Sequence, residues 1–185
     1  MDNDAGRYRR FLDGDDNGLR EIIDANYSGL TLYINSIISD VSETEEIIQD
    51  TFVKLAVKKP KFNGKSSFKT WLYAIARNCA LNHLKRYRSK FSDKPVEDYS
   101  ELSSENDIES EYIETEQNIE LHKAIRSLKP EYSQVLYLMY FEQFDTENIA
   151  KIMHKSKKQV GDLIYRAKQS LKTKLEKAGF QYEEF

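Results

Sequence analysis

The chain has 185 residues, of which 39% are hydrophobic and 32% charged, and its single cysteine excludes an internal disulfide. The chain contains no run of about 18 apolar residues, the length needed to cross a membrane. Its first residues also lack the apolar core of a signal peptide. We therefore expect a cytoplasmic protein without membrane insertion, built as one mid-sized domain or two small ones.

The charge is arranged in blocks. Residues 51–92 contain 11 bases and no acid, whereas residues 1–50 have a net charge of -8 and residues 93–117 one of -9. Aromatic side chains are interleaved with the bases of 51–92. Lysine and arginine neutralise phosphates and aromatic rings stack on unpaired bases, so this block favours nucleic-acid binding. Anionic membranes and acidic proteins are the other partners that such a patch attracts.

Apolar residues recur at helical spacing in the first half of the chain, which predicts an all-α fold. One long stripe of apolar residues covers 19–37 and predicts an amphipathic helix there. A second helix is expected behind the capping box Ser42-x-x-Glu45, and Lys59-Pro60 should end it. Residues 62–67 have the composition of a loop, and the spacing predicts a third helix over 68–87.

Residues 93–117 form an acidic segment, in which an acid occurs at nearly every second or third position and apolar residues are few. This composition favours a flexible or partly helical linker between two domains. Beyond it, one helix is expected over 119–128. Pro130 suits the first turn of the next helix, whose apolar positions reach Met139.

The last part of the chain has the form of a helix-turn-helix. Asp145 or Thr146 should cap a short helix that ends at Met153, and a capping box at Ser156-x-x-Gln159 should start a longer one that stops before Gly179. If Val160, Leu163 and Ile164 point inward, the side chains that face outward are Lys155, Lys157, Lys158, Gln159, Asp162 and Arg166. These are candidate DNA-binding residues, and a helical hairpin with a solvated basic side is the plainer alternative.

Three stretches carry a resemblance to a known family. They are Thr44-Glu-Glu-Ile-Ile-Gln-Asp-Thr-Phe-Val-Lys-Leu55, Phe62-Asn-Gly-Lys-Ser-Ser-Phe-Lys-Thr-Trp-Leu-Tyr-Ala-Ile-Ala-Arg-Asn78 and Leu128-Lys-Pro-Glu-Tyr-Ser-Gln-Val-Leu-Tyr-Leu138. The first two resemble region 2, and the third with the helix-turn-helix resembles region 4, of RNA polymerase sigma factors of the extracytoplasmic-function group in the sigma-70 family. The resemblance implies a region 2-like domain over 7–92, an acidic linker over 93–117 and a region 4-like domain over 118–178.

The resemblance assigns functions to these parts. Residues 7–92 would bind the polymerase core and the minus-ten promoter element, and 118–178 would bind the minus-thirty-five element. The linker would approach the RNA path in the polymerase. The resemblance further implies that Glu46, Gln49 and Asp50 dock on a coiled coil of the largest polymerase subunit. They face outward if Ile47, Ile48 and Phe52 face inward, and an ordinary solvated face is the alternative.

The loop matching 62–69 and the helix after it resemble the element that recognises the minus-ten region and holds the melted non-template strand. An extruded base needs a polar and aromatic pocket with cations nearby. The candidate residues are Asn63, Lys65, Ser66, Lys69, Asn78, Asn82, Lys85, Arg86 and Arg88. Asparagine pairs bidentately with adenine, which suits an A·T-rich target. Phe68, Trp71 and Ile75 have the spacing of a buried stripe, so we expect them in the core.

The sequence departs from the family pattern in two places that affect DNA reading. His154 stands where the turn often has glycine, and Asp162 and Leu163 stand where the recognition helix often has a hydroxyl residue and arginine. Asn82 replaces an aspartate that many relatives have. The base specificity therefore stays open, as do the promoter set, the inducing signal and the existence of an anti-sigma partner.

We expect no enzyme and no cofactor, because no phosphate-binding loop and no nucleophile motif occurs. Cys79 and His83 are four residues apart, but we interpret them as a structural cysteine and a surface histidine rather than metal ligands. The main rival is a free-standing helix-turn-helix regulator that binds duplex DNA without polymerase. A weaker rival is an interaction protein whose basic faces bind acidic partners or membranes.

Overall fold

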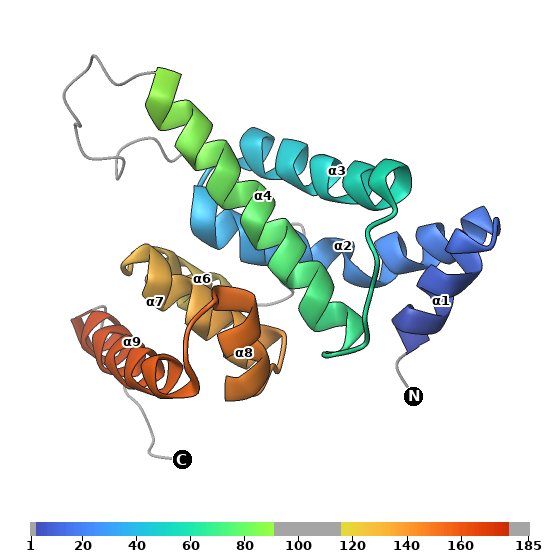
Figure 1. Ribbon diagram of the computed structural model, residues 1–185. Helices are drawn as coiled ribbons and strands as arrows, with labels where there is room; N and C mark the ends of the chain where they lie inside the picture. Colours follow the sequence, from blue (N-terminus) through green and yellow to red (C-terminus); the bar gives the residue numbers. More distant parts are fainter. Residues whose placement is uncertain (1–2, 91–115, 178–185) are drawn as a thin grey trace.

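The computed structural model describes residues 3–90 and residues 116–177 (Figure 1). We call these two ranges the first half and the second half of the chain. The first half contains α1 (Asn3–Leu12), α2 (Asp16–Ile38), α3 (Val41–Lys58) and α4 (Phe68–Lys90). The second half contains α6 (Glu116–Arg126), α7 (Pro130–Leu136), the π-helical turn η2 (Tyr137–Phe141), α8 (Thr146–Met153) and α9 (Lys157–Lys177). All regular elements in the described ranges are helices, which confirms the all-α fold class.

The predicted stripe over 19–37 lies within α2, where the apolar positions are buried. The next helix begins earlier than expected. Asp40 caps α3, because its carboxylate accepts a hydrogen bond from the backbone N–H of Glu43 at 2.8 Å. The capping box predicted at Ser42 was therefore wrong, since an aspartate two residues earlier takes that function. The helix ends as expected at Lys59, which has a left-handed backbone with φ 43°.

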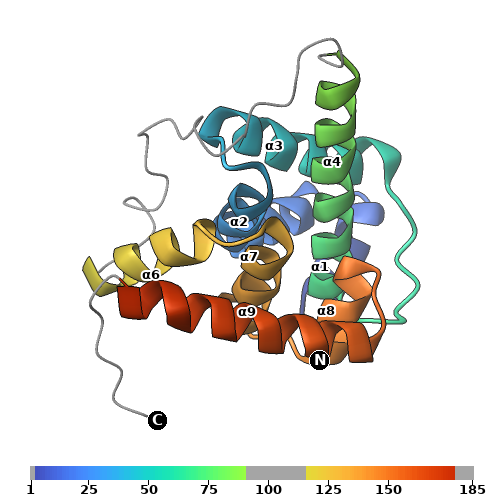
Figure 2. The same cartoon turned by 90° about the vertical axis from the view of Figure 1, so that its left-hand side faces the viewer.

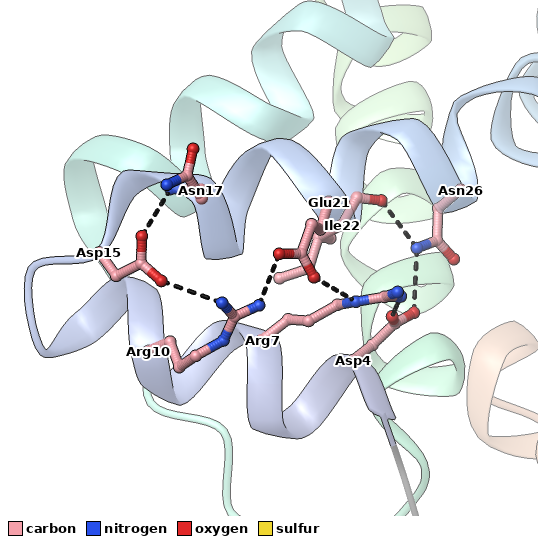
Figure 3. Close-up of polar contacts among 8 residues, drawn as sticks. All are labelled: Asp4, Arg7, Arg10, Asp15, Asn17, Glu21, Ile22 and Asn26. Carbon is pink, nitrogen blue, oxygen red and sulfur yellow. Dashed lines mark hydrogen bonds and ion pairs between the residues drawn. The ribbon is translucent and has the colours of Figure 1, made fainter.

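Helix α1 was not expected from the sequence, and a polar cluster holds it on α2 (Figure 3). Arg7 Nε and Arg10 Nη2 donate to the two carboxylate oxygens of Glu21, at 2.9 and 2.7 Å. Asp4 accepts from Arg7 at 2.6 Å and from the buried amide of Asn26 at 3.1 Å. Each charged group of the cluster thus has a partner across the two helices.

The same helix pair approaches very closely at Gly18. A Cβ atom at this position would lie 2.3 Å from the carbonyl oxygen of Arg7, so α1 packs against α2 only because residue 18 has no side chain. Tyr8 and Phe11 supply the buried face of α1.

An aromatic cluster forms the core at the start of α4. The rings of Tyr8, Phe62, Phe68 and Trp71 have centroid separations between 5.1 and 5.6 Å. Phe68 is fully buried, and Trp71 and Ile75 pack against the core while half-buried. The prediction that these three residues are structural is confirmed.

In the second half, α9 lies across α7 and contacts α6 and α8 (Figure 2). Pro130 occupies the first turn of α7 as predicted, and Asp145, rather than Thr146, caps α8. The predicted capping box at the start of α9 is confirmed: Gln159 N–H donates to Ser156 Oγ at 3.2 Å, and Ser156 N–H donates to Gln159 Oε1 at 2.8 Å. Gly179, the expected stop signal, lies outside the described residues.

A buried histidine sits in the core of the second half. His122 is 2% exposed, and its Nδ1 lies 2.7 Å from the hydroxyl of Tyr137. Burial, and then the charge of Arg126, lower the pKa of His122 to about 4. The imidazole is therefore neutral near pH 7 and acts as a polar core residue.

The two halves pack against each other. Helix α4 contacts α8, and α2 contacts both α7 and η2 (Figures 1 and 2). In the described ranges, no helix combines the length and the apolar content that a membrane crossing needs.

Candidate functional site

The outer face of α3 carries the first predicted site. Glu46, Gln49 and Asp50 are all exposed, whereas Ile47, Ile48 and Phe52 lie in the core. The structure therefore places the three polar residues together on one side of the helix, as their spacing predicted.

Two apolar residues extend this face. Val53 is 56% exposed and Val57 is 70% exposed, one and two turns beyond Gln49. These two valines were not among the predicted site residues, although their four-residue spacing from Gln49 was a usable signal. Polar groups followed by exposed valines give the face the mixed character of a protein contact surface.

The loop before α4 is shaped by its own side chains. Asn63 Oδ1 accepts from the backbone N–H of Lys65 at 3.1 Å, and Ser66 Oγ donates to the carbonyl of Ser67 at 3.1 Å. Gly64 between them has φ +70°. Thr70 N–H donates to Ser67 Oγ at 3.2 Å at the start of α4. The loop thus holds Asn63 and Lys65 at the surface, where both are exposed.

Lys69, unlike Asn63 and Lys65, is half-buried and contacts the second half. Its Nζ lies 2.7 Å from Glu142 Oε2 of the second half, and the Glu142 side chain is only 10% exposed. The ammonium group also lies over the rings of Tyr73 and Phe144, at 5.7 and 5.3 Å. Sequence spacing had no means of showing that this lysine pairs with a carboxylate of the second half.

The remaining candidates lie along α4. Asn82, Lys85 and Arg86 are exposed, and Asn78 is half-buried. The side chain of Arg88 lies outside the part of the chain that the structure describes. The exposed candidates share one end of α4, beyond the part that packs on the second half.

The start of α9 presents the predicted polar face. The exposed candidates there are Lys157, Lys158, Gln159, Asp162 and Arg166. Val160 and Leu163 are buried as expected, and Ile164 is half-buried against the core. This arrangement, with α8 packed on α9 through a short turn, has the geometry that the helix-turn-helix motif requires.

The candidates on this face differ in their neighbours. Lys155 pairs with Glu131 at 3.0 Å and Lys157 pairs with Glu147 at 2.6 Å. Within residues 3–90 and 116–177, Lys158 and Arg166 form no ion pair. Two of the four cations at this face therefore already have a local counter-charge.

The turn between α8 and α9 explains one departure from the family pattern. His154 ends α8 with φ 53° and ψ 45°, the left-handed region that glycine adopts most easily. The backbone therefore keeps the conformation that glycine would provide, at a cost in strain.

In the described residues, no group of three or more His, Cys, Asp and Glu side chains could hold a metal ion. His83 Nε2 instead lies 3.4 Å from Glu43 Oε2.

Comparisons with known proteins agree with this layout. Residues 22–90 match the family model for sigma-70 region 2, and residues 118–171 match the one for sigma-70 region 4. The chain is 32% identical to the RNA polymerase sigma-H factor of Pseudomonas aeruginosa over 142 residues, which is 72% of this chain and 74% of that protein. It is 22% identical to the ECF RNA polymerase sigma factor SigW of Bacillus subtilis over 177 residues, 91% of this chain and 95% of the relative.

Two solved structures have a similar fold. One is the sigma factor RpoE in complex with the anti-sigma factor NepR from Bartonella quintana, with a TM-score of 0.65 and 20% identity over 85% of this chain and 96% of that one. The other is CnrH in complex with the cytosolic domain of CnrY, with a TM-score of 0.68 and 18% identity over 95% and 98%. Because relatives match both halves in order, a free-standing regulator is not favoured.

Proposed function

Because the chain belongs to the extracytoplasmic-function group of the sigma-70 family of RNA polymerase sigma factors, we propose which of its surfaces carries each step of transcription initiation. As a sigma factor it acts with RNA polymerase at promoter DNA. The boundaries proposed for its parts are a polymerase- and minus-ten-binding domain over 7–92, a linker over 93–117 and a minus-thirty-five-binding domain over 118–178.

The polymerase contact is assigned to the outer face of α3. Glu46, Gln49 and Asp50 would dock on the coiled coil of the largest polymerase subunit, and Val53 and Val57 would add apolar contact area. The support is that all five side chains are exposed on one helix face. Buried apolar area at the centre with polar groups around it is the usual anatomy of such interfaces.

The minus-ten contact is assigned to the loop before α4 and to the exposed end of that helix. Asn63, Lys65, Ser66 and Lys69 would hold an unpaired base and its strand, and Asn78, Asn82, Lys85, Arg86 and Arg88 would follow the backbone. The support is chemical: residues 51–92 contain no acid, so no carboxylate of this block opposes the phosphates.

The minus-thirty-five contact is assigned to the start of α9. Lys158, Asp162 and Arg166 are the side chains best placed for direct DNA contact, because Lys155 and Lys157 face carboxylates and Gln159 caps the helix. The observation that carries the whole proposal is that this helix-turn-helix and the exposed α3 face occur in one chain, in the order of sigma regions 2 and 4.

The test is transcription with purified core polymerase on a promoter chosen from genomic fragments by run-off synthesis. Alanine at Asn63, Lys65, Ser66 and Lys69 should leave assembly with core intact and reduce open-complex formation, because the opened strand loses its contacts. Permanganate footprinting reports unpaired thymines near minus ten. Equal thymine reactivity in wild type and the quadruple variant would refute the minus-ten assignment.

An anti-sigma protein is a further proposed partner. The structure of RpoE with a similar fold was determined in complex with an anti-sigma factor. A purified antagonist of this chain should compete with core polymerase for it, and an antagonist that binds without such competition would contradict this assignment.

A further inference from the structure

One acidic side chain interrupts the basic outer face of α9. Asp162 is the only acid between Lys157 and Leu175. Lys158 lies one turn before it and Arg166 one turn after it, so the three exposed side chains share one face of the helix. Among the residues that the structure describes, none of the three forms an ion pair. The Asp162 carboxylate therefore has no charge partner in the described chain.

The residue before it is a glycine that packing within the chain does not explain. Gly161 lies in the second turn of a 21-residue helix, where glycine is less favourable than alanine. A Cβ atom at Gly18 or Gly29 would collide with neighbouring atoms, so packing requires those two glycines. At Gly161 no described atom lies within 4 Å of such a Cβ, and even Tyr165, one turn later, leaves the space open.

This open space lies where a helix-turn-helix protein approaches DNA. Helix α9 runs along the outside of the chain (Figures 1 and 2). In this motif, the first turns of the recognition helix meet base edges in the major groove. Glycine allows a ligand to approach the backbone closely. The aspartate side chain is short, so its carboxylate reaches a base only where the helix and the DNA come close together. Gly161 permits the approach that Asp162 needs.

A carboxylate in the major groove restricts the bases that it can meet. The DNA phosphates repel it, so it lowers the affinity unless a base donates a hydrogen bond to it. An ionised carboxylate only accepts hydrogen bonds. Guanine and thymine present acceptors in the major groove, whereas cytosine N4 and adenine N6 are donors. Adenine N6 lies beside the acceptor N7, which repels the carboxylate, so cytosine is the base that suits aspartate.

We propose that Asp162 reads a cytosine of the minus-thirty-five element by accepting a hydrogen bond from its N4 amino group, and that Gly161 provides the close approach for this contact. The proposal rests on the assignment of the start of α9 to that element made above. Lys158 and Arg166, one turn away on either side, offset the repulsion between the carboxylate and the phosphates. A hydroxyl residue at this position would both donate and accept, so it would not impose the same choice of base.

The experiment selects promoter DNA with holoenzyme assembled from core polymerase and the full chain. The probe is a library of duplexes built on the promoter found by run-off synthesis, with only the minus-thirty-five element randomised. Sequencing of the bound fraction gives the base preference at each position. Wild type is compared with Asp162→Asn, because asparagine has nearly the same shape and matches the N6 and N7 atoms of adenine. Asp24→Asn, at an exposed position of α2, is the matched control.

Wild type and the control should enrich cytosine at one position by about fivefold or more, and Asp162→Asn should shift that position to adenine without changing the others. The asparagine variant should also bind the adenine duplex about as tightly as wild type binds the cytosine duplex. Identical preferences in wild type and Asp162→Asn, or a wild-type preference for another base at the position that changes, would overturn the proposal and leave the minus-thirty-five assignment standing. A wild-type holoenzyme with no preference anywhere in the element would refute that assignment itself.

Gly161→Ala tests the close approach with two readouts of opposite sign. In the free chain, alanine should raise the midpoint of thermal unfolding, because it favours the helix and meets no described atom. On the selected duplex, the added methyl group should weaken holoenzyme binding by about threefold or more. Gly6→Ala in α1, where a Cβ atom also meets no described atom, should raise the midpoint and leave DNA binding unchanged. Duplex binding by Gly161→Ala as tight as that of wild type would show that α9 does not approach DNA closely at this residue.

Discussion

Arg77 Nε donates a hydrogen bond to Gln134 Oε1 at 3.1 Å, although the two residues are 57 positions apart in the sequence. Both side chains are buried, at 8% and 4% exposure. Burial raises the pKa of the Tyr33 hydroxyl, and the nearby Arg77 charge partly lowers it again. A guanidinium group in this position depends on its partner, because an unpaired buried charge is strongly unfavourable.

Replacing Gln134 by methionine should therefore lower the free energy of unfolding by about 1–3 kcal/mol, since Arg77 loses its acceptor in the interior. Urea denaturation followed by circular dichroism measures the change. The double variant with Arg77→Met should recover part of the loss, because neither member of this pair then leaves the other unpaired in the interior. Gln169→Met, at an exposed position of α9, is the control. Additive effects at Arg77 and Gln134 would contradict a direct interaction.

Alanine at Glu46, Gln49 and Asp50 should weaken binding to core polymerase by about tenfold or more without changing the thermal midpoint. The reason is that these side chains are exposed and contribute nothing to the core of α3. Affinity for core can be measured by competition with another sigma factor. Glu176→Ala, at an exposed acid of α9, is the control. Unchanged binding of the triple variant to core polymerase would show that this face of α3 is not the polymerase-binding site.

Stability should fall as the pH drops from about 6.5 toward 4. His122 has a pKa of about 4 in the folded chain, against about 6.5 when unfolded. The unfolded chain therefore binds the proton first, and the stability present above pH 6.5 is lost as the pH falls. The contribution amounts to about 3 kcal/mol in full.

The pH effect is isolated by comparing wild type with His122→Phe in urea denaturation at several pH values. The variant loses the bond to the Tyr137 hydroxyl and should be less stable at pH 7. Its stability should nevertheless depend less steeply on pH between 6.5 and 4. Parallel curves for the two proteins would show that His122 does not titrate in this range.

His154→Gly should raise the free energy of unfolding by about 0.5–1 kcal/mol, because glycine adopts the left-handed conformation at this helix end without strain. Thermal unfolding measures the effect. The matched control is Lys151→Gly in the interior of α8, where glycine should destabilise by about 1 kcal/mol. Loss of stability in both variants would mean that the histidine side chain itself stabilises the turn.

Lys158→Ala should lower the salt slope of duplex binding by about one, as expected for the loss of one phosphate contact. Lys157→Ala should change it less, because Glu147 already offsets that charge at 2.6 Å. Binding of a promoter duplex by the holoenzyme at several salt concentrations distinguishes the two lysines. Identical slopes for both variants would show that the Lys157–Glu147 pair does not persist on DNA.

Helical periodicity was sufficient for α2, α3, α4 and α9, because each has a continuous apolar stripe facing a core. It failed for α1, because only Tyr8 and Phe11 of this helix are buried. Ion pairs from α1 to Glu21 of α2 also hold the helix in place. Helix caps were predicted correctly where a single candidate existed, as at Ser156. At Asp40 and Ser42 two candidates competed, and spacing alone did not distinguish them.

For the candidate site residues, too, features of a single helix were predictable and contacts between distant segments were not. Which face of α3 or α9 points outward follows from the apolar positions of that helix alone. Which group pairs with Lys69 does not, because Glu142 reaches it from a distant part of the sequence through tertiary packing. Local pattern therefore predicts which side chains face outward on an isolated element, but not which of them pair with a group from another element.

The wide turn η2 controls where the chain points after α7. Within it, Glu142 N–H donates to the carbonyl of Tyr137 at 3.2 Å, a span one residue longer than in an α-helix. Deleting one residue here would restore the α-helical pitch and rotate the following segment by about 100° around the helix axis. Glu142 and Phe144 would then face away from α4. A one-residue change in length at this turn, with no change in any contacting side chain, would be enough to separate the two halves.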